Sequence, residues 1–158
     1  MNLLVNREFF FYDLINVKGE KKKTKMSVDM LSLTKVIAIT EEFRRLCLEM
    51  ENEDYPAIND RINHIITGVN LFRNDFGLGT ERNITEYREI YDQFMNNIIQ
   101  DESLSDYQKI VRYSNKIQGN LGLIGAQVEQ RPQNVPKVDE LTIGIIMLLG
   151  DISTRWYR

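Results

Sequence analysis

The chain has little of what secreted and membrane proteins are usually built with. Its 158 residues include one cysteine, Cys47, so no disulfide can form within the chain, and such a chain suits a reducing compartment. The longest apolar run, residues 143–149, has seven residues, whereas a bilayer-spanning helix needs about 20. Arg7, Glu8 and Asp13 interrupt the apolar run near the N-terminus, which argues against a signal peptide. These absences predict a cytoplasmic protein without a membrane partner.

Basic charge is not in excess either. Twenty Lys and Arg residues stand against 23 Asp and Glu residues, which gives a net charge of −3. No global field would draw the chain to nucleic acid or to an anionic membrane, so any such contact has to be local. Hydrophobic residues make up 42% of the chain, an ordinary fraction for a globular protein. We predict a single domain over residues 1–158.

Side chains that commonly carry catalysis are scarce. His64, the only histidine, follows Asp60 by four residues and adjoins an apolar stripe, so we expect it to lie beside the core, partly exposed. Cys47 lies between two leucines, and we expect a core residue and not a reactive thiol. No acids, bases, nucleophiles or metal ligands converge in the sequence. The prediction is a protein that is not an enzyme, with no catalytic, cofactor-binding or metal-binding residue and no cofactor.

One carboxylate pattern keeps a metal-dependent hydrolase open as an alternative. Glu86 and Glu89 are three residues apart on an expected helix, and a second acidic pair on a neighbouring helix would complete a magnesium site. The downstream candidates, Glu102 and Asp106, are four apart and lie on either side of an expected helix start. We therefore rank this alternative below a binding protein.

Glycines recur at every third position in one expected helix, at Gly119, Gly122 and Gly125. They lack the preceding strand and the Gly-Lys-Ser/Thr sequence of phosphate-binding loops. Glycine within a helix costs about 1 kcal/mol relative to alanine. We expect these glycines to line a face where another helix packs closely, with a helix break near Gly119 as the alternative.

The first thirty residues differ from the rest of the chain. An aromatic and β-branched run over residues 9–17 is followed by a polar link with a glycine, and residues 23–30 alternate between polar and apolar. Alternation at period two predicts a strand with one buried face. Two such runs around a short polar link predict a β-hairpin over residues 1–31.

Residues 32–158 have helical periodicity instead. Apolar residues recur at spacings of three and four in five segments, with expected starts at Ser32, at Pro56, at Asn83, at Ser103 or Ser105, and at Asp139. The last segment is apolar almost all round between residues 143 and 149, which places it in the middle of a bundle; a buried strand over residues 141–149 stays open. The predicted fold class is α+β, mostly α, with a two-stranded β-hairpin followed by a bundle of about five helices.

Two charged clusters are the best candidates for a partner-binding surface. The expected hairpin tip has five lysines in eight residues, namely Lys18, Lys21, Lys22, Lys23 and Lys25. The expected end of the first helix has an acidic cluster, Glu49, Glu51, Glu53 and Asp54, where negative charge opposes the helix dipole. A solvated hairpin tip and a solvated acidic corner are the plain alternatives. A nucleic-acid-binding accessory protein is the second functional candidate, because lysines contact phosphate, although arginines and stacking aromatics usually accompany them.

The chain resembles the small inhibitors that phages and mobile elements of low-GC bacteria direct against host defence, anti-CRISPR proteins among them. The features behind this resemblance are the size, a composition rich in Asn, Ile and Lys, the hairpin-plus-helices pattern, and the opposed clusters Lys18 to Lys25 and Glu49 to Asp54. The resemblance implies a protein without cofactor that binds a larger protein, a nuclease or a nuclease–RNA complex, and blocks its DNA binding or cleavage. The two charged clusters would then help to dock the inhibitor onto that partner.

Overall fold

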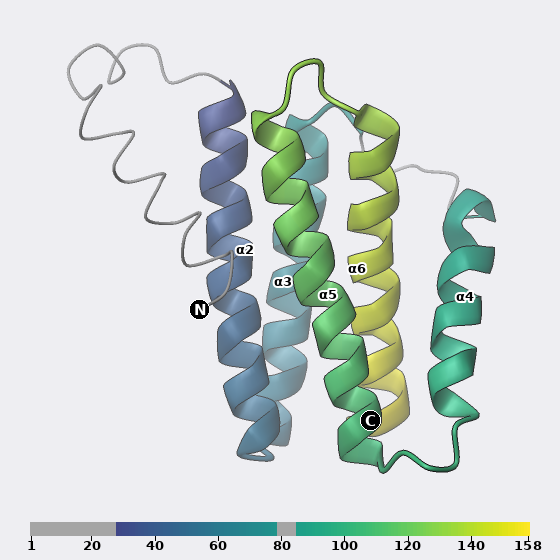
Figure 1. The fold of residues 1–158 in the computed structure, drawn as a ribbon. Helices are drawn as coiled ribbons and strands as arrows, with labels where there is room; N and C mark the ends of the chain where they lie inside the picture. Colours follow the sequence, from purple (N-terminus) through teal and green to yellow (C-terminus); the bar gives the residue numbers. More distant parts are fainter. Residues whose placement is uncertain (1–27, 79–84) are drawn as a thin grey trace.

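The computed structural model describes residues 28–78 and 85–158, which form five helices and no strand (Figure 1). The helices are α2 (Val28–Glu51), α3 (Tyr55–Asp75), α4 (Thr85–Ile99), α5 (Asp106–Glu129) and α6 (Val135–Trp156). Within these ranges no helix is both long enough and apolar enough to cross a bilayer.

The predicted α+β class is wrong for the part of the chain that the structure describes. Residues 28–30, expected at the end of the second strand of the hairpin, form the first turn of α2. The physical reason is that Met30 is buried and continues the three-residue spacing of Leu33 and Val36, so a helical stripe coincides with the last positions of the period-two pattern. Ser32, the predicted N-cap, lies buried within α2. The rest of the predicted hairpin falls on residues 1–27, outside the described residues.

Helices α2, α3, α5 and α6 form a four-helix bundle. Helix α2 packs against α3 and α5, and α6 packs against the same two helices from the opposite corner. Neighbouring helices are antiparallel, since α2 and α6 run in one direction and α3 and α5 in the other (Figure 1). Helix α4 lies outside this bundle, against α6 and α5.

The apolar stripes that define the helices meet in one core. Its most deeply buried members include Leu46 of α2, Ile58 of α3, Ile117 of α5, and Ile145 and Leu148 of α6, each with no exposed area. Burying one such side chain stabilises the fold by about 1.5–3 kcal/mol. The core therefore belongs to all four helices of the bundle, and α4 adds Tyr91, Met95 and Ile98 from its inner side.

Helix α6 confirms the helical interpretation of residues 141–149 and excludes the buried strand. It contacts α3, α4 and α5, which explains why it is apolar almost all round. Its Gly144 is buried directly beneath the ring of Tyr91, and a Cβ at residue 144 would meet that ring at 2.1 Å. Glycine is required here because α4 and α6 approach too closely for any side chain.

The helix ends agree with the sequence in part. Ser105 caps α5 in a capping box with Gln108. This confirms Ser105, one of the two starts that the sequence predicts for this helix. Asp54 caps α3, and Pro56 lies in its first turn. Asn134, and not Asp139, caps α6, whose first turn contains Pro136. The predicted cap of the last helix is therefore five residues too late.

The expectation for the glycines of α5 is wrong at two positions. Helix α5 runs unbroken from Asp106 to Glu129. Around Gly119 and Gly122, no heavy atom of the described residues lies within 4 Å of where a Cβ would stand. Only Gly125 is buried. Neither the helix break nor close packing therefore accounts for Gly119 and Gly122.

A buried ion pair joins α3 to α6 at one end of the bundle. Arg73 has no exposed area, and its Nη1 lies 2.7 Å from Oδ1 of Asp139 and donates to Thr142 Oγ1 at 2.6 Å. The Tyr87 hydroxyl of α4 donates to Oδ2 of the same Asp139 at 3.1 Å. Nε and Nη2 of Arg73 have no hydrogen-bond partner among the described residues. The pair therefore fixes three helices together at the expense of two unsatisfied donors.

Candidate functional site

We call four carboxylates near the end of α2 the acidic corner: Glu49, Glu51, Glu53 and Asp54. The structure separates those that bond within the fold from those that are only exposed to solvent. Glu49 accepts two hydrogen bonds from Arg61 of α3, from Nε at 3.0 Å and from Nη2 at 3.2 Å. Asp54 accepts from the backbone N–H of Ala57 at 3.4 Å as the N-cap of α3. Glu49 is therefore committed to the fold, whereas the other three members of the corner are exposed.

Glu53 lies in the tight turn between α2 and α3 with φ of 55°, a conformation that glycine adopts more readily. The turn holds the exposed Glu51 and Glu53 close to each other along the chain, at the end where the dipole of α2 is negative. Neither Glu51 nor Glu53 forms an ion pair with another of the described residues.

An apolar groove between α2 and α5 begins at this corner. It has a volume of about 340 Å³ and is lined by Phe43, Arg44, Cys47, Leu48 and Glu51 of α2 and by Gln118 of α5. Phe43 forms its buried floor, and Leu48 on its edge is 58% exposed. Single exposed leucines are common on protein surfaces, but Leu48 adjoins an apolar hollow, where burial against a partner would add to affinity.

Cys47 belongs to the wall of this groove and is half-buried. Burial, and secondarily the negative charge of Glu51, raise the pKa of the Cys47 thiol to about 11. The thiol is therefore neutral at physiological pH and behaves as a small apolar wall and not as a nucleophile. The side chain therefore lies at the edge of the core, and not inside it as the sequence predicts.

The groove and the acidic corner share Glu51, so they form one continuous surface. We call the six groove residues together with Glu53 and Asp54 the docking surface. The positive charge nearest to its apolar part is Arg44, which is paired with Glu41 on the same helix. The docking surface therefore has an apolar centre with net negative charge at its rim.

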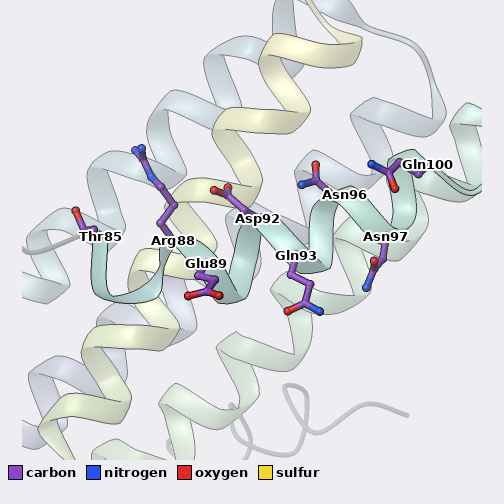
Figure 2. Close-up of a pocket in the computed structure, with 8 residues that line it drawn as sticks. All are labelled: Thr85, Arg88, Glu89, Asp92, Gln93, Asn96, Asn97 and Gln100. Atoms are coloured by element: carbon purple, nitrogen blue, oxygen red, sulfur yellow. The ribbon is translucent and has the colours of Figure 1, made fainter.

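A second hollow follows the outward side of α4 and has a different chemistry. Its volume is about 780 Å³ and its walls all come from one helix: Thr85, Arg88, Glu89, Asp92, Gln93, Asn96, Asn97 and Gln100. Figure 2 shows these side chains along α4, with Arg88 and Asp92 on one side and Glu89 and Gln93 on the other. None of them is apolar, so this face offers no anchor for a partner, and a solvated helix face explains it.

The other predicted candidates do not come together. Glu89 is exposed on α4. Glu102 is exposed just before α5, and Asp106 is exposed at its first residue. Among residues 28–78 and 85–158, no three His, Cys, Asp or Glu side chains are close enough together to hold a metal ion. His64 is exposed on α3. The lysine cluster, Lys18 to Lys25, lies outside the described residues.

The sequence interpretation missed Leu48 and Gln118. Leu48 does not share the three-and-four spacing of Phe43, Leu46 and Met50, and a helical wheel would have placed it outside the buried stripe. Gln118 had no comparable signal, because its place in the groove depends on which helix packs beside α2.

Comparison of the chain with protein-family models, with curated proteins and with solved structures finds no match in any of the three.

Proposed function

We propose that this chain is a non-enzymatic, cytoplasmic inhibitor that docks onto a larger protein through the docking surface. The observation that supports this proposal is the continuity of the apolar groove with the acidic corner through Glu51. An apolar centre with a polar or charged rim is the anatomy of protein–protein interfaces. In such interfaces a few residues that become fully buried carry most of the binding energy, and Leu48, exposed on the edge of the groove, would be buried by a partner that fills it.

The charge distribution favours a basic partner. Residues 1–27 have six Lys and Arg against three Asp and Glu, so residues 28–158 have 14 against 20 and a net charge of −6. Acidic surfaces attract basic ones and raise the rate of encounter. The docking surface would fit a partner surface in which one large apolar side chain is flanked by Lys or Arg residues.

Basic surfaces of this kind are common on proteins that hold nucleic acid, because phosphate contacts dominate nucleic-acid affinity. An acidic inhibitor seated there would block the nucleic acid from binding. The anti-CRISPR-like role expected from the sequence enters the proposal in this form, with a nuclease or a nuclease–RNA complex as partner. The alternative of direct nucleic-acid binding depends on Lys18 to Lys25, which lie outside the described residues.

Capture of the partner by matched variants tests the proposal. The full chain is tagged and used as bait in a nuclease-treated extract of its source cells, beside Leu48→Lys and the control Leu71→Lys. Leu71 is a good control because it is 53% exposed on α3, away from the groove. We expect one protein to be captured by wild type and by the control and to be reduced at least tenfold with Leu48→Lys.

The captured protein is then purified and its binding to labelled nucleic acid is measured with and without the full chain. The proposal expects the nucleic acid to be displaced by wild type and not by Leu48→Lys. Capture that is equal for Leu48→Lys and Leu71→Lys would show that the groove is not the docking surface. If a parallel capture from an extract without nuclease treatment recovers nucleic acid and no protein, the proposal is overturned.

A further inference from the structure

Six residues of α5 lie on one outward stripe, because they follow one another at alternating spacings of three and four residues. We call them the α5 stripe: Arg112, Asn115, Gly119, Gly122, Ala126 and Glu129. Five of them are exposed, and Gly122 is partly exposed. In Figure 1, α5 lies at the front of the bundle, with no other described helix in front of it. The α5 stripe is therefore a helix face that no other described helix covers.

The middle of the α5 stripe is small and has no charge. No heavy atom of the described residues lies within 4 Å of where a Cβ of Gly119 or Gly122 would stand. Each of these glycines costs the helix about 1 kcal/mol relative to alanine, and packing among the described residues does not account for this cost. Residues without a side chain allow a second backbone to approach closely, and charge is depleted at the centre of protein interfaces. The middle of the stripe therefore suits close contact with another helix.

The two ends of the α5 stripe have opposite charge, so the stripe is complementary to a second copy of itself in the antiparallel orientation. A two-fold axis midway between Gly119 and Gly122 places each of these glycines opposite the other glycine of the second copy. Arg112 and Glu129 are equally far along α5 from that axis, so each lies opposite the other and forms an ion pair at either end. In the parallel orientation Arg112 would face Arg112 and Glu129 would face Glu129, and like charges would repel. We propose that two copies of the chain associate in antiparallel orientation through the α5 stripe.

The geometry of α5 fits such a pairing. Alternating spacings of three and four residues are those of two helices that wind around each other. The contact would extend from Arg112 to Glu129, which is about 26 Å at 1.5 Å per residue. Leu123, which is 49% exposed, adjoins Gly122 and would be buried near the axis in both copies. Two acidic chains can meet here because only the ends of the stripe are charged, and the charges there attract.

This association goes beyond the proposed function and does not depend on it. None of the six residues of the α5 stripe belongs to the docking surface, whose contribution from α5 is Gln118. Loss of the dimer and loss of the captured partner are therefore produced by different variants and can be told apart.

Analytical ultracentrifugation of the full chain at micromolar to millimolar concentration tests the association. We expect wild type to shift from monomer to dimer as the concentration rises. Arg112→Glu and Glu129→Arg should each weaken the dimer by about tenfold, since each replaces two attractions at the ends of the stripe by two repulsions. The matched controls are Arg88→Glu and Glu89→Arg, which make the same charge changes at exposed positions of α4 and should leave the dimer unchanged.

Mixing the two single variants provides the decisive measurement. Arg112→Glu and Glu129→Arg each repel their own copies, but an equal mixture of the two forms both ion pairs again, with the charges exchanged between the two copies. We expect the mixture, and likewise the double variant, to dimerise as wild type does. The proposal is overturned by a wild-type chain that stays monomeric at every concentration. A dimer that resists both charge reversals, or a mixture that stays monomeric although both variants keep their helical circular-dichroism spectrum, overturns it as well.

The glycines give a second and independent readout. Gly119→Gln together with Gly122→Gln places two long side chains where the two backbones would meet, so the dimer should be lost. The fold of the single copy should tolerate this change, because both positions are open among the described residues and glutamine favours a helix more than glycine does. Thermal unfolding in dilute solution checks that the variant is folded. Gly150→Gln, at an open position of α6, is the control and should dimerise normally. A folded double variant that still dimerises as wild type does would overturn the proposal.

Discussion

Gly144 of α6 lies so close to Tyr91 of α4 that a Cβ on residue 144 would stand 2.1 Å from Cζ of the ring. The Tyr91 hydroxyl accepts a hydrogen bond from Asn120 Nδ2 of α5 at 3.1 Å, and the same amide donates to the carbonyl of Leu141 at 3.1 Å. Three helices therefore meet at one buried polar contact, and the absence of a side chain at residue 144 makes it possible.

Substitution of Gly144 by alanine should destabilise the protein. The Tyr91 ring has to move, and overpacking of this kind costs about 1–3 kcal/mol. Gly150→Ala is the matched control on the same helix, since no described heavy atom lies within 4 Å of its would-be Cβ. Urea unfolding should show a lower midpoint for Gly144→Ala and an unchanged or higher one for Gly150→Ala. Equal midpoints would show that α4 does not depend on this contact.

Alanine at Gly119 and Gly122 should stabilise the protein. Both positions are helical and open among the described residues, so the substitution removes the helix penalty of glycine, about 0.5–1 kcal/mol at each site. Thermal unfolding of the double variant should therefore shift upward. A downward shift would mean that this face of α5 is covered in the folded chain.

Removal of the half-buried carboxylate of Asp139 should be more costly than removal of both partners of its ion pair with the buried Arg73. Asp139→Asn leaves the Arg73 guanidinium buried without a counter-charge, which costs about 3–5 kcal/mol. Arg73→Met removes that charge, so the double variant should recover part of the loss. A double-mutant cycle of unfolding free energies measures the coupling. Additive single effects would show that the two side chains do not act as a pair.

Stability should fall in alkaline solution because the folded state holds several phenol protons. Burial and the nearby Asp151 carboxylate raise the pKa of Tyr113, and burial raises the pKa of Tyr91 and of Tyr157. In the unfolded chain these phenols titrate near 10, so their stabilisation is complete below about pH 10 and is lost as the pH rises above it.

The expected slope is on the order of 1 kcal/mol per pH unit for each phenol that keeps its proton. Unfolding free energies at pH 8 and pH 11 test this. Tyr113→Phe should lose stability at pH 8, because the hydrogen bond to Asp151 is gone, yet lose less than wild type between the two pH values. Tyr107→Phe, at an exposed position, should keep the wild-type difference. A pH-independent free energy in wild type would contradict the prediction.

The sequence predicts those features that depend on neighbours three or four residues away. The stripes of α3 and α6, the Ser105 cap and the place of Pro56 follow from local spacing and are confirmed. The start of α2 could not be predicted in this way, because Met30 belongs both to an alternation at period two and to a helical stripe.

The candidate site depends on partners that are distant in the chain. Glu49 looked as available as Glu51, but Arg61 of the next helix neutralises it. Asp139 looked like a helix cap, but it faces Arg73, 66 residues before it. Only the packing of helices decides which charges stay free for a partner.

Helix α4 also makes the topology of the bundle possible, because it connects the end of α3 to the start of α5. Helices α3 and α5 run in the same direction (Figure 1), so the chain has to travel the length of the bundle between them. The 15 residues of α4 cover about 22 Å of that path at 1.5 Å per residue. A short turn in place of α4 would leave α5 unable to start at its end of the bundle. Helix α4 is therefore the segment that carries the chain back between α3 and α5. Its removal would force a different topology.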